Sequence, residues 1–476
     1  MSETSLAEQS PGAGKPVRGD LTQGPILRTL VMFSIPALIG NVLQTVGGSI
    51  NAIWIGQLLG IKAVAATASA NMIMFLLFGT VFGFGMATTI RVGHLFGARD
   101  IDGARRNFGG GIGFCVGLSL VITITVWLLA DRVLALMATP AEVRGDAHAY
   151  LRIAFLSMPF STFAMMVSMG LRGAGDATTP LFNSVITVVL ATILNPLLIK
   201  GIGPIPPMGI AGSALAGFIA GMVGAVQMIW TIYARDLPLR LRGAELRYLL
   251  PSREEVAYML AKGLPMGAQT LLSTAAGVIM IGLVNREGMI AAAAYGASLQ
   301  LWNYVQMPAM AVGSAVSTMV AQNIGARQHH RVGRITMSGL WSTFAVTLAL
   351  AAGLVLFDKP VLGLFLGAGS PAIPLAEHIQ LICTWSFAVS SVMMVLFATM
   401  RAYGAVWMPL IVMFTSLYPV RIGFYALAQP TLHSEAVWWT FPVSSVVSVV
   451  LAVLAYRFGR WRKVQAAGIS AQPASA

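Results

Sequence analysis

Twelve apolar segments, each long enough to cross a bilayer as a helix, dominate this sequence and restrict the folds that it can adopt. A bilayer core of ~30 Å requires about 20 apolar helical residues. Six segments precede an arginine-rich stretch, 235–254, and six follow it. They are 29–58, 64–95, 107–130, 148–171, 179–200 and 209–234, then 255–285, 290–324, 335–357, 375–400, 407–429 and 434–457. The sequence therefore predicts an all-α integral membrane protein with twelve transmembrane helices in two six-helix bundles, 29–234 and 255–457.

The composition excludes a soluble protein. Charged residues make up 10% of the 476 residues and hydrophobic residues 57%, whereas a soluble domain has roughly 25% charged residues. A formal charge of +13 would suggest nucleic acid as the partner of a soluble protein. Here the basic residues lie in short loops between apolar segments, so we expect membrane lipid as a partner and no nucleic acid.

The positions of the basic residues predict the orientation in the membrane. Most of the 30 lysines and arginines fall on one side, in the tails and in the loops that follow every second segment. Loops rich in Lys and Arg stay in the cytoplasm. We therefore expect a plasma-membrane protein (in bacteria, the inner membrane) with cytoplasmic tails, 1–28 and 458–476, and a cytoplasmic linker, 235–254. The first two dozen residues lack the apolar core of a cleavable signal and predict a disordered tail.

The two halves repeat each other at an offset of 228 or 229 residues, here called the repeat offset. The recurring features are Pro36 and Pro265, Gly97-Ala-Arg99 and Gly325-Ala-Arg327, and Arg172 and Arg401. Because each unit has six spans, both insert with the same orientation and are related by a pseudo-twofold axis along the membrane normal. Such parallel repeats are typical of secondary transporters with a site between the halves. Gly97 and Gly325 are expected to end their helices, a position that suits glycine.

Four of the repeated residues are candidates for structural or gating roles. Arg172 and Arg401 lie at the inner ends of helices, where a cation suits both the helix terminus and the cytoplasmic face. Pro36 and Pro265 lie inside helices, where a proline frees a carbonyl and permits bending. Either proline fits a moving hinge or a static kink. Asp176, in the turn after Arg172, is interpreted as a turn residue or helix N-terminal acid.

The order and spacing of several motifs resemble the multidrug and toxic compound extrusion (MATE) transporters. The matching motifs are Pro36 with Ile53-Trp-Ile-Gly56, Gly97-Ala-Arg99, Leu171-Arg-Gly-Ala-Gly-Asp176 with Pro180, Asn195-Pro-Leu-Leu-Ile199 with Gly209-Ile-Ala-Gly-Ser-Ala214, and Ala294-Tyr-Gly296 with Gln322-Asn-Ile-Gly-Ala-Arg327. The resemblance implies a monomer that exports small organic compounds, often cationic, driven by inward flow of H⁺ or Na⁺.

The chain departs from this family where the ion-coupling acids are expected. The acidic position of the first helix holds Asn51, and the aspartate position late in the fifth helix holds Asn195. Some branches of the family have a glutamate early in the seventh helix, where this chain has only Gln269 and Ser273. None of the 17 Asp and Glu residues is placed at membrane depth. Since amides do not titrate near neutral pH, a carboxylate proton relay has no evident carrier.

Asn51 and Asn195 are predicted to lie at similar depth, in the outer half of the first bundle. Each is ~22 Å along its helix from a proline near the inner side, at 1.5 Å per residue. They could therefore hydrogen-bond each other. An interhelical clasp worth ~0.6 kcal/mol and a substrate or ion site are both open interpretations.

Arg421 is the one basic residue placed near mid-membrane. An intramembrane arginine normally faces a cavity or a partner, and no acid is expected at its depth. Backbone carbonyls or an anionic group of substrate or lipid could satisfy it. Gln300 and Asn303, with Trp302 between them, are expected to line a cavity of the second bundle.

Three readings compete with a MATE-like exporter. A flippase or exporter of a lipid-linked or anionic solute fits Arg421 and the missing acids. A transport-dead receptor or scaffold would explain lost coupling residues. An intramembrane enzyme is disfavoured, because the sequence has no HExxH, paired-aspartate or Gly-x-Ser-x-Gly motif. Cys115 and Cys383 suggest neither a disulfide framework nor a metal site, and no cofactor is expected beyond a coupling ion.

Overall fold

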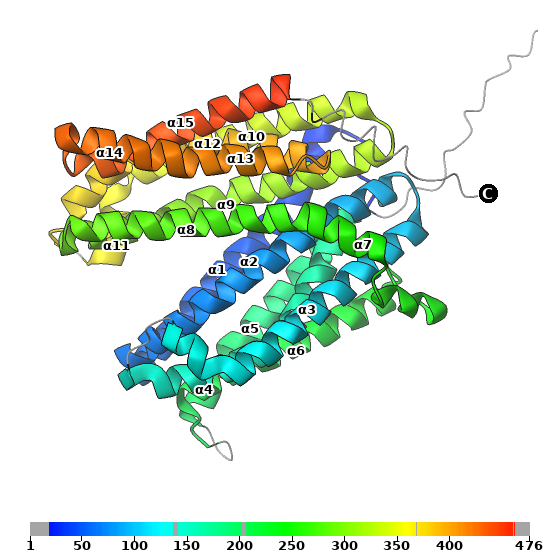
Figure 1. The fold of residues 1–476 in the computed structure, drawn as a ribbon, viewed down its shortest axis with the longest axis horizontal. Coiled ribbons are helices and arrows are strands. Elements are labelled where there is room, and N and C mark those ends of the chain that lie inside the picture. Colours follow the sequence, from blue (N-terminus) through cyan, green and yellow to red (C-terminus); the bar gives the residue numbers. More distant parts are fainter. Residues whose placement is uncertain (1–18, 137–140, 202–205, 368, 460, 462–476) are drawn as a thin grey trace, which may run out of the picture.

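The computed structural model describes residues 19–136, 141–201, 206–367, 369–459 and 461. Every regular element in these ranges is a helix (Figure 1). The first half contains α1 Ile26–Leu59, α2 Ile61–Gly97, α3 Ile101–Leu136, α4 Ala141–Gly173, α5 Thr178–Lys200 and α6 Gly209–Ala234. Each of the six predicted segments of this half thus corresponds to one helix.

The second half has six spans, two of which are interrupted by a π-helical turn. The spans are α7 Arg253–Tyr258 with η2 Met259–Gly263 and α8 Leu264–Arg286, α9 Met289–Gly325, α10 His329–Leu356, α12 Ile373–Ala402, α13 Trp407–Thr415 with η3 Ser416–Val420 and α14 Arg421–Leu432, and α15 Glu435–Phe458. A short helix, α11 Asp358–Leu366, was not predicted. In the described residues, 10 helices meet the length and hydropathy expected of a membrane span. The predicted fold class is confirmed.

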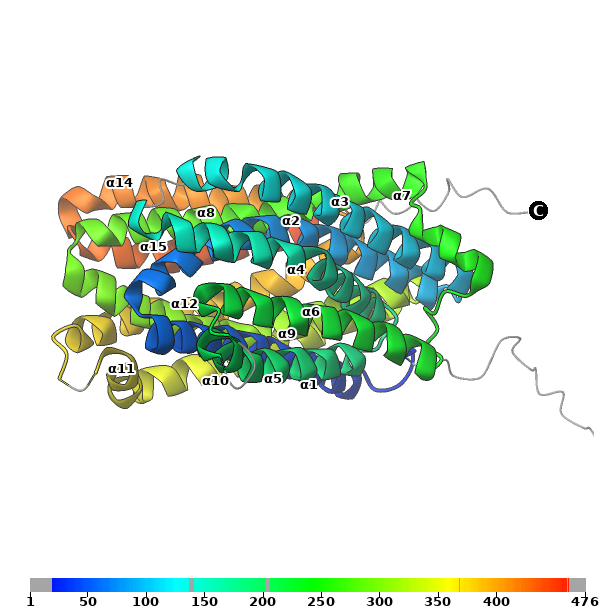
Figure 2. The same cartoon turned by 90° about the horizontal axis from the view of Figure 1, so that it is seen from below.

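The two halves meet at one end of the molecule and diverge toward the other. In both views the helices follow the long axis of the molecule (Figure 1, Figure 2). We call the end that carries the α2–α3, α4–α5 and α9–α10 turns the basic end. Figure 1 shows α1–α6 and α8–α15 converging there and separating toward the end that contains α11 and α14.

An apolar core at the basic end joins the halves. It combines side chains from both, including Met86 and Ile90 of α2 with Met319 and Val320 of α9, and all four are nearly inaccessible. A further core lies within the second half, and another lies in the first half with Met259 of η2 packed into it. Burial of apolar side chains therefore holds the basic end closed.

Gly97 and Gly325 do not terminate their helices in the way the sequence predicted. The residues with left-handed backbone are Arg99, with φ 61°, and Arg327, with φ 57°. Each arginine lies just beyond the end of its helix, while both glycines are still helical. The helices do end at Gly97 and Gly325, as predicted, but the left-handed residue beyond each end is an arginine and not the glycine.

Close packing of α2 against α9 explains both glycines. A Cβ on Gly97 would lie 2.0 Å from the carbonyl oxygen of Gln322, and one on Gly325 would lie 1.9 Å from that of His94. No side chain fits at such distances, so the two backbones touch. This crossing is equivalent on both sides of the repeat.

The part of the amino-terminal segment that the structure describes, residues 19–25, is ordered and not disordered as predicted, while residues 1–18 of the predicted tail lie outside the described residues. Residues 19–25, here called the strap, cross the basic end, and Leu21 is only 7% exposed. The Leu21 N–H donates to Gln322 Oε1 at 2.9 Å, and Asn323 Nδ2 donates to the Leu21 carbonyl at 3.3 Å. Buried apolar contact and these hydrogen bonds offset the entropy of ordering the strap.

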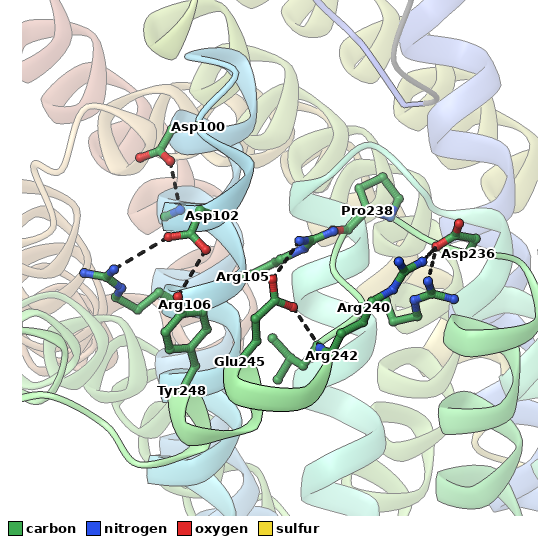
Figure 3. A network of polar contacts seen from close by, with 12 residues as sticks. Asp100, Asp102, Arg105, Arg106, Asp236, Pro238, Arg240, Arg242, Glu245 and Tyr248 are labelled. Carbon is green, nitrogen blue, oxygen red and sulfur yellow. Dashed lines mark hydrogen bonds and ion pairs between the residues drawn. The ribbon is translucent and has the colours of Figure 1, made fainter.

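The linker between the halves is fixed to the basic end of α3. It contains a 3₁₀ helix, η1 Gly243–Leu249. Arg105 Nη1 lies 2.9 Å from Glu245 Oε1, and the Tyr248 hydroxyl donates to Asp102 Oδ1 at 3.1 Å (Figure 3). The linker therefore follows the first half rather than hanging free.

The two repeated prolines differ in their surroundings. α1 runs through Pro36 as one helix. Pro265 instead lies in the first turn of α8, directly after the π-helical turn η2. Single π turns often mark functional sites, and neither η2 nor η3 was predicted. Whether Pro36 or Pro265 acts as a hinge stays a prediction.

Candidate functional site

A cavity of about 840 Å³ lies in the first half and faces the second. Its wall comes from α1, α2, α4, α5 and α6, and Thr270 of α8 and Met310 of α9 contribute from the other half. Tyr150 and Asn71 mark the end remote from the basic end, and the Tyr150 hydroxyl donates to Asn71 Oδ1 at 3.4 Å. This volume lies within the range of small-molecule sites.

The lining combines amides with flexible apolar side chains. The amides are Asn41, Gln44, Asn51, Asn71, Asn183 and Asn195. The apolar part includes Met74, Phe75, Phe78, Phe82, Met165 and Met169. Arg172 is the one charged side chain among the described lining residues, which include no carboxylate. Such a wall can adapt to organic molecules of different shape while its amides bind polar groups.

Asn51 and Asn195 hydrogen-bond each other within this cavity. Asn195 Nδ2 donates to Asn51 Oδ1 at 2.8 Å, and the Ser213 hydroxyl donates to the same oxygen at 3.1 Å. The contact between the two asparagines agrees with their predicted depth. Ser213 was missed because the sequence alone does not give the rotation of α6, although it lies in the quoted Gly209–Ala214 motif. Their role in substrate or ion binding stays a prediction.

One acceptor of this cluster is unused. Asn195 Oδ1 is buried and has no hydrogen-bond partner among the described residues. Asn195 itself is 2% exposed, and its Nδ2 also donates to the Ala191 carbonyl at 3.2 Å. A buried acceptor without a donor costs about 1–3 kcal/mol. A ligand or cation at this oxygen would remove that cost.

Arg172 lies in the last turn of α4, at the basic end of the cavity. Its Nε is buried and lacks a partner in the described part of the chain. Asp176 does not pair with it, because Asp176 Oδ1 accepts from the N–H groups of Thr178 and Thr179, each at 3.0 Å. Asp176 is thus a helix N-terminal acid, as predicted.

Arg401 and Gln269 lie away from the cavity and contact each other. Arg401 Nη1 donates to Gln269 Oε1 at 3.5 Å, and Gln269 Nε2 donates to the Val406 carbonyl at 3.2 Å. Gln269 is 5% exposed. This pair links α8 to the α12–α13 turn.

Arg421 is held by a serine and an aromatic ring. Its Nε and Nη2 donate to Ser444 Oγ at 3.1 and 2.8 Å, and its guanidinium carbon lies 4.7 Å from the centre of the Phe441 ring. Phe441 belongs to an aromatic cluster with Tyr295 and Trp302. The partners of Arg421 are therefore Ser444 and the Phe441 ring, and not the backbone carbonyls that the sequence suggested.

Comparison with known proteins identifies the family. The MatE family model matches this chain twice, over residues 36–197 and 265–427. The chain belongs to the MatE family. The two matches to this MATE transporter domain begin at Pro36 and Pro265, which are equivalent positions of the sequence repeat. The predicted resemblance is confirmed, and the family is one of transporters.

Two curated MATE relatives come from Bacillus subtilis. The "Probable multidrug resistance protein YoeA" is 31% identical over 442 residues, 92% of this chain and 95% of the relative. The "Probable multidrug resistance protein YpnP" is 30% identical over 447 residues, 94% and 98% of the two chains. A solved MATE structure described as an outward-facing conformation superposes with a TM-score of 0.87 at 22% identity, covering 95% of this chain and 100% of that one. It establishes the MATE fold.

Two hydrogen bonds close the basic end of this MATE protein at equivalent positions. His94 Nε2 lies 2.8 Å from the Ala402 carbonyl, and Gln322 Nε2 donates to the Gly173 carbonyl at 2.9 Å. Each bond joins one half to the other, and the repeat offset that relates Gly97 to Gly325 also relates His94 to Gln322. We call the two bonds together the latch. Sequence reasoning quoted Gln322 within a motif but assigned it no contact.

Gln300 and Asn303 lie on α9, outside the cavity described above. Asn303 is exposed and Gln300 half-buried. Trp302, between them, is 1% exposed, and its Nε1 donates to Gln380 Oε1 at 2.9 Å. The aromatic face of α9 is therefore part of the core of the second half. That Gln300 and Asn303 line a second cavity stays a prediction.

Proposed function

We propose that this protein exports small organic compounds across the bacterial inner membrane by alternating access, with the first-half cavity as the substrate site. The observation that carries the proposal is an amide- and methionine-lined cavity of about 840 Å³ that faces the opposite half. Its size suits drug-like molecules. The names of the Bacillus relatives support multidrug export.

The basic end is proposed to face the cytoplasm, with both termini inside. Arg99 in the α2–α3 turn, Arg327 in the α9–α10 turn and Arg172 in the last turn of α4 support this orientation through the positive-inside rule. The cavity would then be closed toward the cytoplasm by the latch, as in an outward-facing state. We also propose that the protein acts as a monomer among membrane lipids, since one chain supplies both halves of the site.

Transport requires a second state in which the latch is broken and the halves meet at the other end. A substrate can favour one state only through its different affinity for the two. The glycine crossing of α2 and α9 suits this exchange, because backbone surfaces without interlocking side chains can separate without repacking of rotamers.

The coupling ion is proposed to be Na⁺ or H⁺. Asn51, Asn195 and Ser213 offer neutral oxygens, and Asn195 Oδ1 has no donor among the described residues. Amide and hydroxyl oxygens suit Na⁺, whereas they do not take up a proton near neutral pH. Coupling to H⁺ would therefore use a group outside this cluster.

The test is dye efflux from proteoliposomes with proton and sodium gradients imposed separately. Acceleration by the sodium gradient, lost in Asn195→Ala and kept in Asn285→Ala, is the expected result. Asn285, near the end of α8, is the matched control because it is an exposed asparagine outside the cavity. Dye movement that ignores both gradients would contradict ion coupling. A folded, inserted protein that moves no dye of any charge would contradict export and favour a receptor or scaffold.

A further inference from the structure

The charge of the substrate can be inferred from the basic end of the cavity. A buried cation is costly unless a counter-charge or hydrogen-bond acceptors compensate it. Arg172 has neither a carboxylate beside it in the lining nor a partner for its Nε in the described residues. The carboxylate closest to it along the chain, Asp176, caps α5 instead.

The repeat shows a difference between the two equivalent arginines. The Nε of both Arg172 and Arg401 lacks a partner in the described residues, but Arg401 Nη1 donates to Gln269 Oε1 at 3.5 Å, and Arg172 has no such acceptor there. At the repeat offset that relates these two arginines, the counterpart of Gln269 in the first half is Gly40. Gly40 has no side chain to offer, and a Cβ there would meet nothing closer than Ser184 Oγ at 4.0 Å. The first half therefore has a glycine, with space for a side chain, at the sequence position where the second half has this amide.

The remaining lining favours a molecule with one polar end. Asn183 and Ser184, in the second turn of α5, line the same end of the cavity as Arg172. Phe78, Phe82 and Met165 supply apolar surface elsewhere in it. A guanidinium binds the two oxygens of a carboxylate, sulfonate or phosphate through parallel N–H donors.

We propose that Arg172 is the anion-binding residue of the cavity and that the preferred substrates are amphipathic organic anions or zwitterions. The anionic group lies against Arg172, and the apolar body extends toward Tyr150 and Asn71. This inference rests on the proposed export function and specifies its substrate class. The sequence analysis considered an exporter of anionic solutes with Arg421 as the residue that binds the anion. Here the anion is proposed to bind Arg172 instead.

The experiment compares a rhodamine that carries a free carboxylate with its ethyl ester. Binding of each dye to the purified full-length protein is measured by fluorescence anisotropy, and efflux of each from proteoliposomes is measured in parallel. We expect the carboxylate dye to bind roughly tenfold more tightly than the ester, as expected for hydrogen bonds to a charged group. Arg172→Gln should abolish this preference, and Arg172→Lys should keep part of it.

Gly40→Gln tests the same idea without removing the charge. The new amide should accept a hydrogen bond from Arg172, as Gln269 does from Arg401. Binding of the carboxylate dye should then weaken, and binding of the ester should stay unchanged. Gly40→Ala is the matched control, because it adds a Cβ to the same place without an acceptor. Arg401→Gln, which removes the equivalent cation outside the cavity, should leave the preference intact.

The outcomes separate this inference from the export function. Equal binding of both dyes by the wild-type protein, or an unchanged preference in Arg172→Gln, would overturn the anion site while ester efflux still supports export. Failure of the protein to bind or move either dye would overturn both. Thermal unfolding of each variant in detergent shows whether it is folded. If Arg172→Gln does not fold, Gly40→Gln gives the decisive result.

A lipid headgroup and a free solute share the chemistry proposed for this site. Repeating the binding measurement with added phosphatidylglycerol distinguishes them. Displacement of the carboxylate dye by this lipid, but not by a neutral phosphatidylcholine, would assign the site to an anionic lipid. Retention of the dye in both lipids would assign it to a free organic anion.

Discussion

At the scale of single residues, Asn51, Asn195 and Ser213 form a hydrogen-bonded cluster of neutral side chains where three helices meet. Asn51 Oδ1 accepts from two helices, through Asn195 and Ser213. A carboxylate at position 51 would accept the same two hydrogen bonds. The cluster thus holds α1, α5 and α6 together with amides and a hydroxyl, which fixes the helices without a titratable group.

Asn51→Asp should introduce or strengthen the pH dependence of transport, because a carboxylate titrates whereas an amide does not. The measurement is the initial rate of dye efflux from proteoliposomes between mildly acidic and mildly alkaline pH. Asn285→Asp, an acid at the exposed end of α8, is the control. An unchanged pH profile in folded Asn51→Asp would argue against a coupling role for this position.

Ser444→Ala should destabilise the protein by about 1–3 kcal/mol, because it removes the acceptor of a part-buried arginine. Arg421 would lose both of the hydrogen bonds described above. Thermal unfolding in detergent measures the change. Ser448→Ala is the control, since that hydroxyl bonds only a carbonyl of its own helix. Equal midpoints for the two variants would mean that Ser444 adds little to the stability of this site.

At the scale of helices, α2 and α9 pack closely against each other at the closed basic end. Gly97 and Gly325 let the two backbones touch, and Gly93 of α2 lies against the Cβ of Ala321. At these glycines no side chain separates α2 from α9, so the stability of the crossing depends on close packing of the two backbones. One added methyl group is enough to disturb it.

Gly97→Ala should destabilise the closed basic end by about 1–3 kcal/mol, the usual cost of overpacking. The readout is labelling of Ser168→Cys, a cavity position, by an impermeant maleimide applied from the basic side, with Cys115 and Cys383 replaced by alanine. Labelling should accelerate. In Gly333→Ala, where a Cβ meets nothing within 4 Å, it should not. Equal labelling of both variants would show that the crossing does not control access.

Local rules predicted the helices well and the contacts between them poorly. Apolar length identified all twelve spans, and the rise per residue placed Asn51 beside Asn195. The contact of Gly97 with α9 was missed because a helix-ending glycine and a helix-crossing glycine look alike in sequence. The π-helical turns before Pro265 and Arg421 were missed, since one extra residue in a turn leaves no periodic signal. Ser213 and the open position at Gly40 depend on helix rotation, which only tertiary packing determines.

At the scale of the whole molecule, the latch is symmetric in position but not in chemistry. His94 and Gln322 hold opposite sides of the same closed interface. The strap reinforces only one side, because Leu21 bonds Gln322 and not His94. The two sides of the basic end are therefore expected to open with different ease, the His94 side first.

His94→Gln should preserve the closed state, because glutamine already makes the equivalent bond on the other side. His94→Leu should weaken it, and the double variant His94→Leu/Gln322→Leu should open the basic end more than either single change. The labelling assay of Ser168→Cys measures each. If the double variant labels no faster than the wild-type protein, apolar packing alone closes this end.

The strap has a further meaning for how the chain is ordered. At the repeat offset it corresponds to residues 248–254, the last part of the linker. Both six-helix units thus enter their first helix through a short lead along the basic end. The contacts of the linker that the structure shows are made with α3 of the first unit, so they do not require the second unit to follow the first in the chain. A circular permutant that begins with the second unit, with a linker joining its end to the strap, should assemble the same transporter.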